Sequence, residues 1–176
     1  MSLDGVRSLL LPDADIQSRV QDLAARIEPA IDDETVCVCL LTGGLWFAAD
    51  LTRALSRLGR NPLFDALWMT SYGDARTSSG QALIRAGLQR SVKDKQVLLI
   101  DDVLDSGLSL ATAKELMLEL GARDVLVAVF AEKPWPTKRD FTADFVAWNA
   151  PDRFLIGYGM DASGRYRGLP DIEAVD

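Results

Sequence analysis

The sequence predicts an α/β fold, a single domain in which a mostly parallel, twisted core sheet is flanked by helices. Four short and mainly apolar runs, at residues 36–41, 63–69, 97–100 and 124–130, have the length and composition of buried strands. Helical patterns with a 3.6-residue period lie between several of these runs, as in units that build a parallel sheet. The chain has 176 residues, and a domain of about 150 residues buries about 68–70% of its unfolded surface, so one core suffices.

Composition and charge exclude several other classes of protein. Hydrophobic residues make up 48% of the chain and charged residues 26%, which are ordinary values for a globular protein. No apolar run approaches the length of a membrane span, about 18 residues. A net charge of −7 argues against a nucleic-acid partner. The first residues lack the basic and apolar regions of a cleavable signal, so we expect a cytoplasmic location.

The residues most used for redox, metal and acid–base chemistry are scarce. Cys37 and Cys39 are the only cysteines, and they lie on one face of an apolar strand. A mutual disulfide is implausible at that spacing, so we expect buried free thiols. The chain contains no histidine. Proton transfer would therefore fall to carboxylates, lysine, tyrosine or solvent.

The first expected helix begins with Asp13 and Asp15, because acidic residues favour a helix start. The residues of its apolar face recur with a helical period: Ile16, Val20, Leu23, Ala24 and Ile27. After the strand at 36–41, the loop Thr42-Gly43-Gly44 leads into a second apolar helix over 45–55. Such a loop is compatible with an anion site at the helix start, and equally with glycines needed for steric reasons.

The strand at 63–69 leads into a long polar stretch, residues 70–80. Polar segments of this length are typical of mobile functional loops, with a disordered surface loop as the plainer alternative. Residues 81–88 would then form a short strand that returns from this loop. The later strand over 124–130 ends just before Lys133, which without further context is an ordinary surface lysine.

The richest segment is 97–109, a buried strand that runs into Asp101, Asp102 and Asp105 and then into a turn. Ligands of open α/β sheets bind beyond the carboxyl ends of the strands, so these carboxylates lie where chemistry is expected. A helix with an apolar stripe over 108–120 begins at the turn, and its free N–H groups form a natural phosphate cradle. Carboxylates beside such a cradle would hold Mg²⁺ or accept hydrogen bonds from sugar hydroxyls. The segment therefore indicates a site for a phosphorylated sugar.

This segment resembles the phosphoribosyl-pyrophosphate motif of the type I phosphoribosyltransferases, and the whole chain resembles their hypoxanthine-guanine branch. The resemblance implies a core over about 16–132 and a small base-binding hood from about 1–12 and 133–176. It also implies a transferase that joins a 6-oxopurine, hypoxanthine or guanine, to phosphoribosyl pyrophosphate with release of pyrophosphate. Mg²⁺ would be the cofactor, and a homodimer or homotetramer the expected assembly.

Within the acidic segment, the resemblance assigns three roles. Asp105 would be the general base that accepts the N7 proton of the purine. Asp101 and Asp102 would hold the ribose hydroxyls, and both are also expected at the metal. The phosphate would be bound by the turn residues Ser106, Gly107, Leu108 and Ser109.

Two other segments match loops of the family. The loop after the first strand resembles the pyrophosphate loop, so Thr42, Gly43 and Gly44 would contact pyrophosphate. The family usually carries lysine where this chain has Thr42, a departure that removes a charge and keeps the backbone amides. Ser71 and Tyr72 match the signature dipeptide of the catalytic lid, which would close over the sugar and exclude water.

The C-terminal segment resembles the base-binding hood. Lys133 would donate to the 6-oxo group of the purine, and because lysine has no acceptor it disfavours the amino group of adenine. Phe154 would stack on the base, and Leu155 would present backbone groups to its edge, which leaves the side chain at 155 free to vary. Asp161 would bind Mg²⁺ through water. Arg167 would hold pyrophosphate with its planar guanidinium.

Two alternatives stay open. A xanthine phosphoribosyltransferase fits the same residues, because xanthine differs from guanine only at C2. A non-catalytic regulatory protein that senses phosphoribosyl pyrophosphate could keep the same cradle, although such regulators usually carry an added basic domain or surface.

Overall fold

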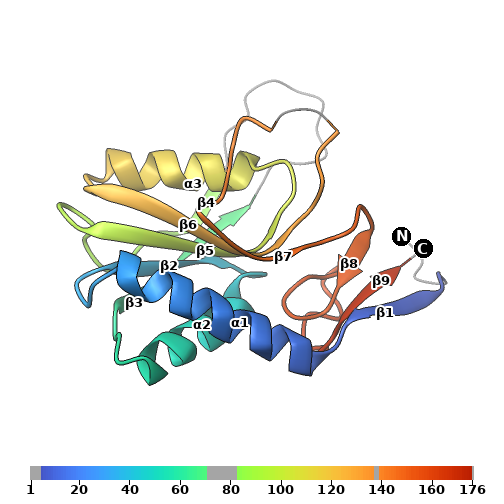
Figure 1. Cartoon of the computed structure of the whole chain (residues 1–176). Helices are drawn as coiled ribbons and strands as arrows, with labels where there is room; N and C mark the ends of the chain where they lie inside the picture. Colours follow the sequence, from blue (N-terminus) through green and yellow to red (C-terminus); the bar gives the residue numbers. More distant parts are fainter. Residues whose placement is uncertain (1–4, 71–82, 137–138, 176) are drawn as a thin grey trace.

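A sheet of six strands forms the centre of the computed structural model, which describes residues 5–70, 83–136 and 139–175 (Figure 1). The strand order is β4-β3-β2-β5-β6-β7. Neighbours are parallel except for β4, which pairs antiparallel with β3 at one edge. The strands are β2 (Val36–Leu41), β3 (Leu63–Thr70), β4 (Leu83–Ala86), β5 (Gln96–Leu104), β6 (Asp124–Glu132) and β7 (Phe145–Asn149). The predicted α/β class with a mostly parallel core sheet is confirmed.

Helices cover both faces of this sheet (Figure 1). On one face lie α1 (Asp13–Ile27), a short 3₁₀ turn η1 (Glu28–Ala30) and α2 (Leu45–Arg57), and on the other lies α3 (Leu108–Glu119). The side chains predicted for the inner face of the first helix are all buried. Under α2, the rings of Phe47 and Phe130 meet edge to face with their centroids 5.7 Å apart. The sheet therefore separates two apolar cores, as expected for strands that are buried on both faces.

A second sheet, of three antiparallel strands, stands to one side of the core (Figure 1). Its order is β1-β9-β8, and its strands are β1 (Arg7–Leu11), β9 (Ile172–Val175) and β8 (Phe154–Ile156). The expected hood segment 133–176 is thus divided, because β7 pairs with β6 in the core sheet and only β8 and β9 leave it. The reason is that β7, which is partly buried, extends the core sheet beside β6 before the chain reaches the small sheet.

The acidic segment differs from its prediction in length. The sequence predicts a strand over 97–100, whereas β5 continues to Leu104. Asp101 and Val103 remain in register with Val129 and Ala131 of β6. Backbone pairing does not depend on the polarity of the side chain, and β6 is long enough to continue the ladder. Two of the three acids, Asp101 and Asp102, therefore belong to a strand and are held by its backbone.

Several smaller predictions agree with the structure. Cys37 and Cys39 are buried free thiols, and burial raises the pKa of both to about 12. Gly121 follows α3 with a φ of 88°, as predicted for the residue that ends this helix. The polar stretch at 70–80 lies, apart from its first residue, outside the described residues. None of the helices in the described part of the chain is long and apolar enough to cross a bilayer.

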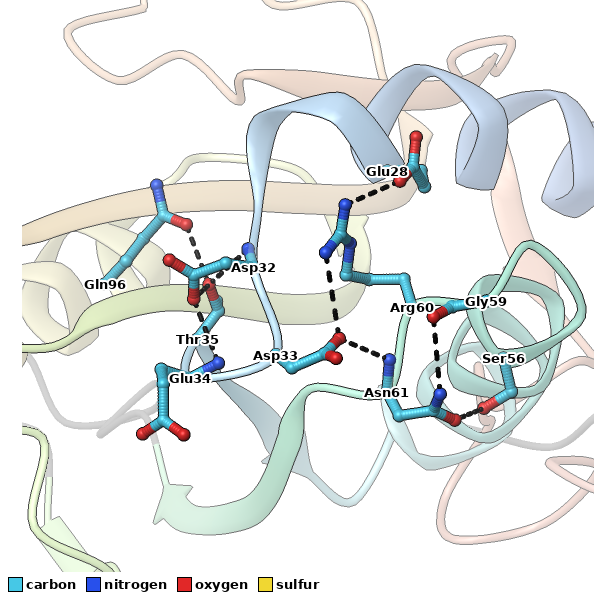
Figure 2. A network of polar contacts seen from close by, with 10 residues as sticks. All are labelled: Glu28, Asp32, Asp33, Glu34, Thr35, Ser56, Gly59, Arg60, Asn61 and Gln96. Atoms are coloured by element: carbon cyan, nitrogen blue, oxygen red, sulfur yellow. Dashed lines mark hydrogen bonds and ion pairs between the residues drawn. The ribbon is translucent and has the colours of Figure 1, made fainter.

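A network of polar side chains ties together the amino ends of the core strands (Figure 2). Arg60 forms an ion pair with Glu28 at 2.7 Å and lies 3.8 Å from Asp33, which also accepts the backbone N–H of Asn61. The buried Thr35 donates to Gln96 of β5 at 2.9 Å. The residues of this network lie just before β2 and β3 and at the first residue of β5. The network therefore holds the amino ends of these three strands together.

Leu155 fastens the small sheet to the core. Its side chain is 4% exposed and belongs to the same apolar cluster as Ile16 and Phe47. The expectation that this side chain is free to vary is wrong. Successive residues of a strand point to opposite faces, so the outward position of Phe154 requires Leu155 to point inward.

Truncation of Leu155 tests this attachment. We expect Leu155→Ala to lower the free energy of unfolding by about 2–5 kcal/mol, because it leaves a cavity in a closed core. Urea denaturation measures the change. The control is Leu9→Ala on β1, where the side chain is 59% exposed and the loss should stay within about 0.5 kcal/mol. Equal losses in the two variants would contradict the burial argument.

Candidate active site

The carboxyl ends of β2, β5 and β6 meet the small sheet around a pocket of about 340 Å³. Its lining is Gly43, Asp102, Val103, Asp105, Lys133, Phe154, Leu155, Met160, Asp161 and Arg167. A second pocket, of about 220 Å³, is lined by Asp101, Asp102, Val103, Asp105, Ser106, Gly107, Ser109 and Leu110. The two pockets share Asp102, Val103 and Asp105, so they adjoin along the end of β5.

The second pocket is built by the turn between β5 and α3. Gly107 has a φ of 84°, in the left-handed region, and immediately precedes the helix. The Oγ of Ser106 accepts the backbone N–H of Leu108 at 3.3 Å. The side chain of Leu108 is exposed and does not line the pocket. The turn therefore offers hydroxyls and the amino end of a helix, which together suit an anion.

The loop between β2 and α2 approaches β5 closely. A Cβ atom on Gly43 would lie 2.0 Å from Oδ2 of Asp102, and one on Gly44 would lie 2.8 Å from the carbonyl oxygen of Leu40. Glycine is needed at both positions because any side chain would displace the loop. Gly43 lines the first pocket, Gly44 is buried and Thr42 is exposed outside the lining. Of the three predicted loop residues, one therefore faces the pocket directly.

Asp101 and Asp102 are neighbouring acids at the pockets: Asp102 lines both, and Asp101 lines the second. Burial raises the pKa of Asp101 well above its ordinary value, and the charge of Asp102 raises it further. Burial also raises the pKa of Asp102, against the opposing effect of hydrogen bonds and of the Arg167 guanidinium. Oδ1 of Asp101 accepts the backbone N–H of Asp102 at 3.0 Å. The pair would gain from a bound cation or from hydroxyl donors of a ligand.

Lys133 faces the acidic segment from the end of β6. Its Nζ lies 3.8 Å from Oδ2 of Asp105, and its backbone N–H donates to the carbonyl oxygen of Leu104 at 3.0 Å. The lysine is mostly buried, whereas the Asp105 carboxylate is largely exposed to the pocket. The two groups are therefore within ion-pair distance of each other, and both line the first pocket.

Phe154 closes this space from the small sheet. The ring is 44% exposed and lines the first pocket. β8 is an edge strand of its sheet, so alternate backbone N–H and C=O groups point away from β9. An exposed ring beside free backbone groups can stack on a planar base and hydrogen-bond to its edge.

Asp161 and Arg167 form an ion pair at the opposite rim, with 2.6 Å between Oδ1 and Nη2. Oδ2 of Asp161 also accepts the backbone N–H of Gly164 at 2.6 Å, and Arg167 donates to the carbonyl oxygen of Gly159. Both carboxylate oxygens are therefore engaged by protein donors. The guanidinium lines the pocket, where it can meet an anion.

The structure adds three residues that sequence reasoning missed. Val103 lines both pockets, Met160 lines the first, and Gly159 has a φ of 100° with its Cα against the carbonyl oxygen of Gly43. The paired glycines around Tyr158 were a usable signal for this close turn. Val103 and Met160 carry no signal, because an apolar residue beside an acid is ordinary in any sequence.

Not every predicted residue can be placed. Ser71 and Tyr72, the expected lid, lie outside the described residues. Among the described residues, no group of three or more cysteine, aspartate or glutamate side chains is arranged to hold a metal ion. Asp102 and Asp161 line the first pocket, and Asp101 and Asp102 line the second.

Comparison with known proteins supports a family assignment. The family model described as the phosphoribosyl transferase domain matches residues 14–163. A hypoxanthine-guanine phosphoribosyltransferase of Aquifex aeolicus is 38% identical over 170 residues, which are 96% of this chain and 94% of that protein. A protein of the same name from Bacillus subtilis is 34% identical over 168 residues, 95% of this chain and 92% of that protein.

Solved structures agree in fold. A hypoxanthine phosphoribosyltransferase of Staphylococcus aureus superposes with a TM-score of 0.87 at 30% identity, covering 96% of this chain and 91% of that one. The enzyme of the same activity from Trypanosoma cruzi superposes with a TM-score of 0.90 at 28% identity, covering 98% and 93%.

Because the pKa of Asp101 is raised, replacing this acid by a neutral side chain should stabilise the fold, by an amount that depends on pH. An acid whose pKa is higher in the folded than in the unfolded state stabilises the fold at low pH, and this stability is lost as the pH rises through the folded pKa. At pH 7.5, Asp101→Asn should therefore raise the melting temperature, by about 2–4 °C for each kcal/mol regained. The gain should shrink at acidic pH, where the wild-type side chain is protonated.

Thermal melts between pH 4.5 and 8 measure this difference. Asp152→Asn, at an exposed position, is the control for the change in net charge and should leave the melting temperature unchanged. If Asp101→Asn melts no higher than the wild type at pH 7.5, the electrostatic account of this acid is wrong.

Proposed function

The chain belongs to the phosphoribosyl transferase family, and on this premise we propose that it transfers a phosphoribosyl group to a 6-oxopurine, hypoxanthine or guanine. The donor is 5-phosphoribosyl 1-pyrophosphate, and the products are IMP or GMP and pyrophosphate. One observation carries the proposal: a lysine and an exposed aromatic ring face a carboxylate that borders an anion-binding turn. A purine and a phosphorylated sugar would thus meet at Asp105.

Lys133 and Phe154 would recognise the purine. Lys133 presents only donors, so it favours an oxo group at C6 over an amino group. Phe154 would stack on the base, and the free backbone groups of β8 around Leu155 would bind its edge. Together these groups discriminate 6-oxopurines from adenine.

The phosphoribosyl pyrophosphate would lie along the end of β5. The amino end of α3 with Ser106, Gly107, Leu108 and Ser109 would hold the 5-phosphate. Asp101 and Asp102 would accept hydrogen bonds from the ribose hydroxyls. The loop of Thr42, Gly43 and Gly44 would hold the pyrophosphate together with Arg167. Because Thr42 is uncharged, Arg167 would supply much of the positive charge on that side.

Mg²⁺ is the proposed cofactor, and the donor set fits it. Asp101 and Asp102 are oxygen donors whose pKa values are raised by burial, and Mg²⁺ is usually held by one or two carboxylates with water and substrate oxygens. Asp161 would act through water, because both its oxygens already accept protein hydrogen bonds. When bound, Mg²⁺ supplies neutralisation of charge on the pyrophosphate.

Asp105 would be the general base. As a purine nitrogen attacks the anomeric carbon and the bond to pyrophosphate breaks, the carboxylate would take the proton from N7 of the base. The other acids would stabilise the positive charge that develops on the ribosyl ring. Ser71 and Tyr72, in the expected lid, would exclude water from the anomeric carbon.

Two alternative functions are compatible with the same site residues. A xanthine phosphoribosyltransferase would use the same lysine and ring, and differs in what it accepts at C2 of the base. A protein that only senses phosphoribosyl pyrophosphate would bind the sugar phosphate without transferring it. The expected cytoplasmic location stays a prediction.

A Mg²⁺-dependent assay with phosphoribosyl pyrophosphate and hypoxanthine, guanine, xanthine, adenine or uracil tests the proposal. We expect IMP and GMP to form and adenine and uracil to be inert. Product from xanthine alone would favour the first alternative. Binding of phosphoribosyl pyrophosphate without product from any base would favour the second.

Replacement of Asp105 tests the proton acceptor. Asp105→Asn keeps the size and hydrogen-bonding capacity of the side chain but removes its basicity, so turnover should fall by roughly 10²-fold or more. Steady-state kinetics with saturating substrates measure this loss. Asp152→Asn serves again as the exposed control, and unchanged turnover in Asp105→Asn would refute the assignment.

We propose that the active form is a homodimer that uses the outer part of β3. Phe64 and Trp68 lie on the face of the sheet that α2 covers, yet both rings are close to half exposed. Leu45, at the start of α2, is exposed to a similar degree. Exposed large apolar side chains on one face of a strand are typical of a protein interface.

Light scattering should give about twice the chain mass of 19.2 kDa. Trp68→Arg should shift the protein to the monomer, because it puts a charge into the interface. Leu118→Arg, at an exposed position on α3, should leave the mass unchanged. A monomeric wild type would overturn the proposed assembly, and a tetramer would show that a further contact exists.

A further inference from the structure

The connection between β6 and β7 contains an arginine that is buried beside the proposed purine site. The side chain of Arg139 is only 8% exposed. Its Nη1 pairs with Oε1 of Glu132 at 2.5 Å, and its Nη2 donates to the carbonyl oxygen of Lys133 at 2.5 Å. The Trp135 ring lies over the guanidinium, with 5.8 Å from Cζ to the ring centroid. Arg139 thus bonds both to the last residue of β6 and to the lysine that follows it.

These contacts fix the backbone of Lys133 on both sides. Its N–H donates to the carbonyl oxygen of Leu104, which immediately precedes Asp105. Its C=O accepts the bond from Arg139. The lysine is therefore attached at one side to the end of β5 and at the other to a buried guanidinium. With its backbone held, Nζ is kept 3.8 Å from the Asp105 carboxylate.

The chemistry of the contact requires arginine in particular. A guanidinium presents several N–H donors in a rigid plane, so one side chain can bridge a carboxylate and a neighbouring carbonyl oxygen. Its Nε is buried without a partner among the described residues, which makes arginine an expensive choice for packing alone. An apolar side chain would fill the same space without that penalty, but it could not hold the carbonyl group of Lys133.

We propose that Arg139 is a positioning residue for purine recognition. Through Glu132 and the carbonyl group of Lys133, it holds the lysine at the position from which Nζ meets the 6-oxo group. This inference rests on the proposed function, since it concerns the same purine site. Arg139 does not line the first pocket, so it acts through Lys133 and touches neither substrate.

Kinetics of Arg139→Met test the proposal. The KM for hypoxanthine should rise about tenfold or more, because a small misplacement of a recognising group is enough to weaken binding. The KM for phosphoribosyl pyrophosphate should stay within about twofold, because the sugar-phosphate turn is untouched. Arg123→Met is the matched control: this arginine also pairs with an acid, Asp124, but at the far end of β6. It should change neither constant.

The binding of two nucleotides distinguishes a role in positioning Lys133 from a general effect on the fold. The Kd of IMP should rise about tenfold in Arg139→Met, whereas purine riboside 5′-monophosphate, which lacks the 6-oxygen, should bind as in the wild type. A purely structural role would weaken both nucleotides alike. Equal losses for the two nucleotides, or no loss for either, would therefore overturn the proposal.

Two further variants guard against simple unfolding. Arg139→Lys keeps a charge beside Glu132 but cannot also bridge to the carbonyl oxygen, so it should recover the melting temperature and not the KM for hypoxanthine. Glu132→Gln combined with Arg139→Met removes both charges together and should fold even if the single variant does not, with the same rise in KM. If Arg139→Lys recovers the KM for hypoxanthine together with the melting temperature, the proposal that Arg139 positions Lys133 is wrong.

The proposed function itself can fail separately. A wild-type protein that forms no IMP or GMP would refute the transferase proposal and, with it, the role of Lys133. An active wild type with an unaffected Arg139→Met variant would refute only the role of Arg139.

Discussion

Close approach of three segments at two glycines is the constraint on which the site depends. A Cβ atom on Gly159 would lie 2.1 Å from the carbonyl oxygen of Gly43, and one on Gly43 would lie 2.0 Å from the Asp102 carboxylate. The turn after β8 therefore lies against the loop after β2, and that loop lies against the Asp102 side chain at the end of β5, with no room for a side chain on either glycine. This close approach brings groups from opposite ends of the chain to one pocket. It also explains why two glycines far apart in sequence are needed at once.

The approach of these segments also gathers charged side chains at the pockets, and the stability of the fold does not require them. Asp101 and Asp102 are buried side by side, and burial together with the charge of Asp102 raises the pKa of Asp101. Asp105 lies within ion-pair distance of Lys133, and Asp161 pairs with Arg167. Buried acids reduce stability, so the two apolar cores and the polar network at the amino ends of the strands must offset them. Residues that strain a fold in this way are common where a ligand supplies the missing partners. The cluster of acids thus favours a ligand that brings hydroxyl donors or a cation to them over a purely structural role.

Rigid attachment distinguishes the proposed purine side of the site from the proposed sugar side. Phe154 belongs to an edge strand whose next residue, Leu155, is buried in the core, so the ring is held by its own strand. Lys133 lies beyond the end of β6 and is held by Leu104 and Arg139 instead. The turn proposed to bind phosphate depends instead on Gly107, whose left-handed backbone immediately precedes α3. Phe154 and the turn at Gly107 are therefore positioned by their own segments, whereas Lys133 depends on contacts from other segments.

Local patterns were sufficient to determine the α/β class, the helix faces and the acidic strand–turn–helix, because apolar runs, helical periods and glycine turns depend on neighbouring residues. The sequence spacing of Asp101, Asp102 and Asp105 likewise determines that these acids lie close together at the end of one strand. Other features depend on residues that are distant in sequence: the pairing of β7 with β6, the burial of Leu155, the contact of Gly159 with Gly43 and the bonds of Arg139. No local pattern encodes these, because the energy of a side chain at such a position is set by what the rest of the chain packs against it. Tertiary structure alone therefore decided how Lys133 is held and which backbones meet at the pocket.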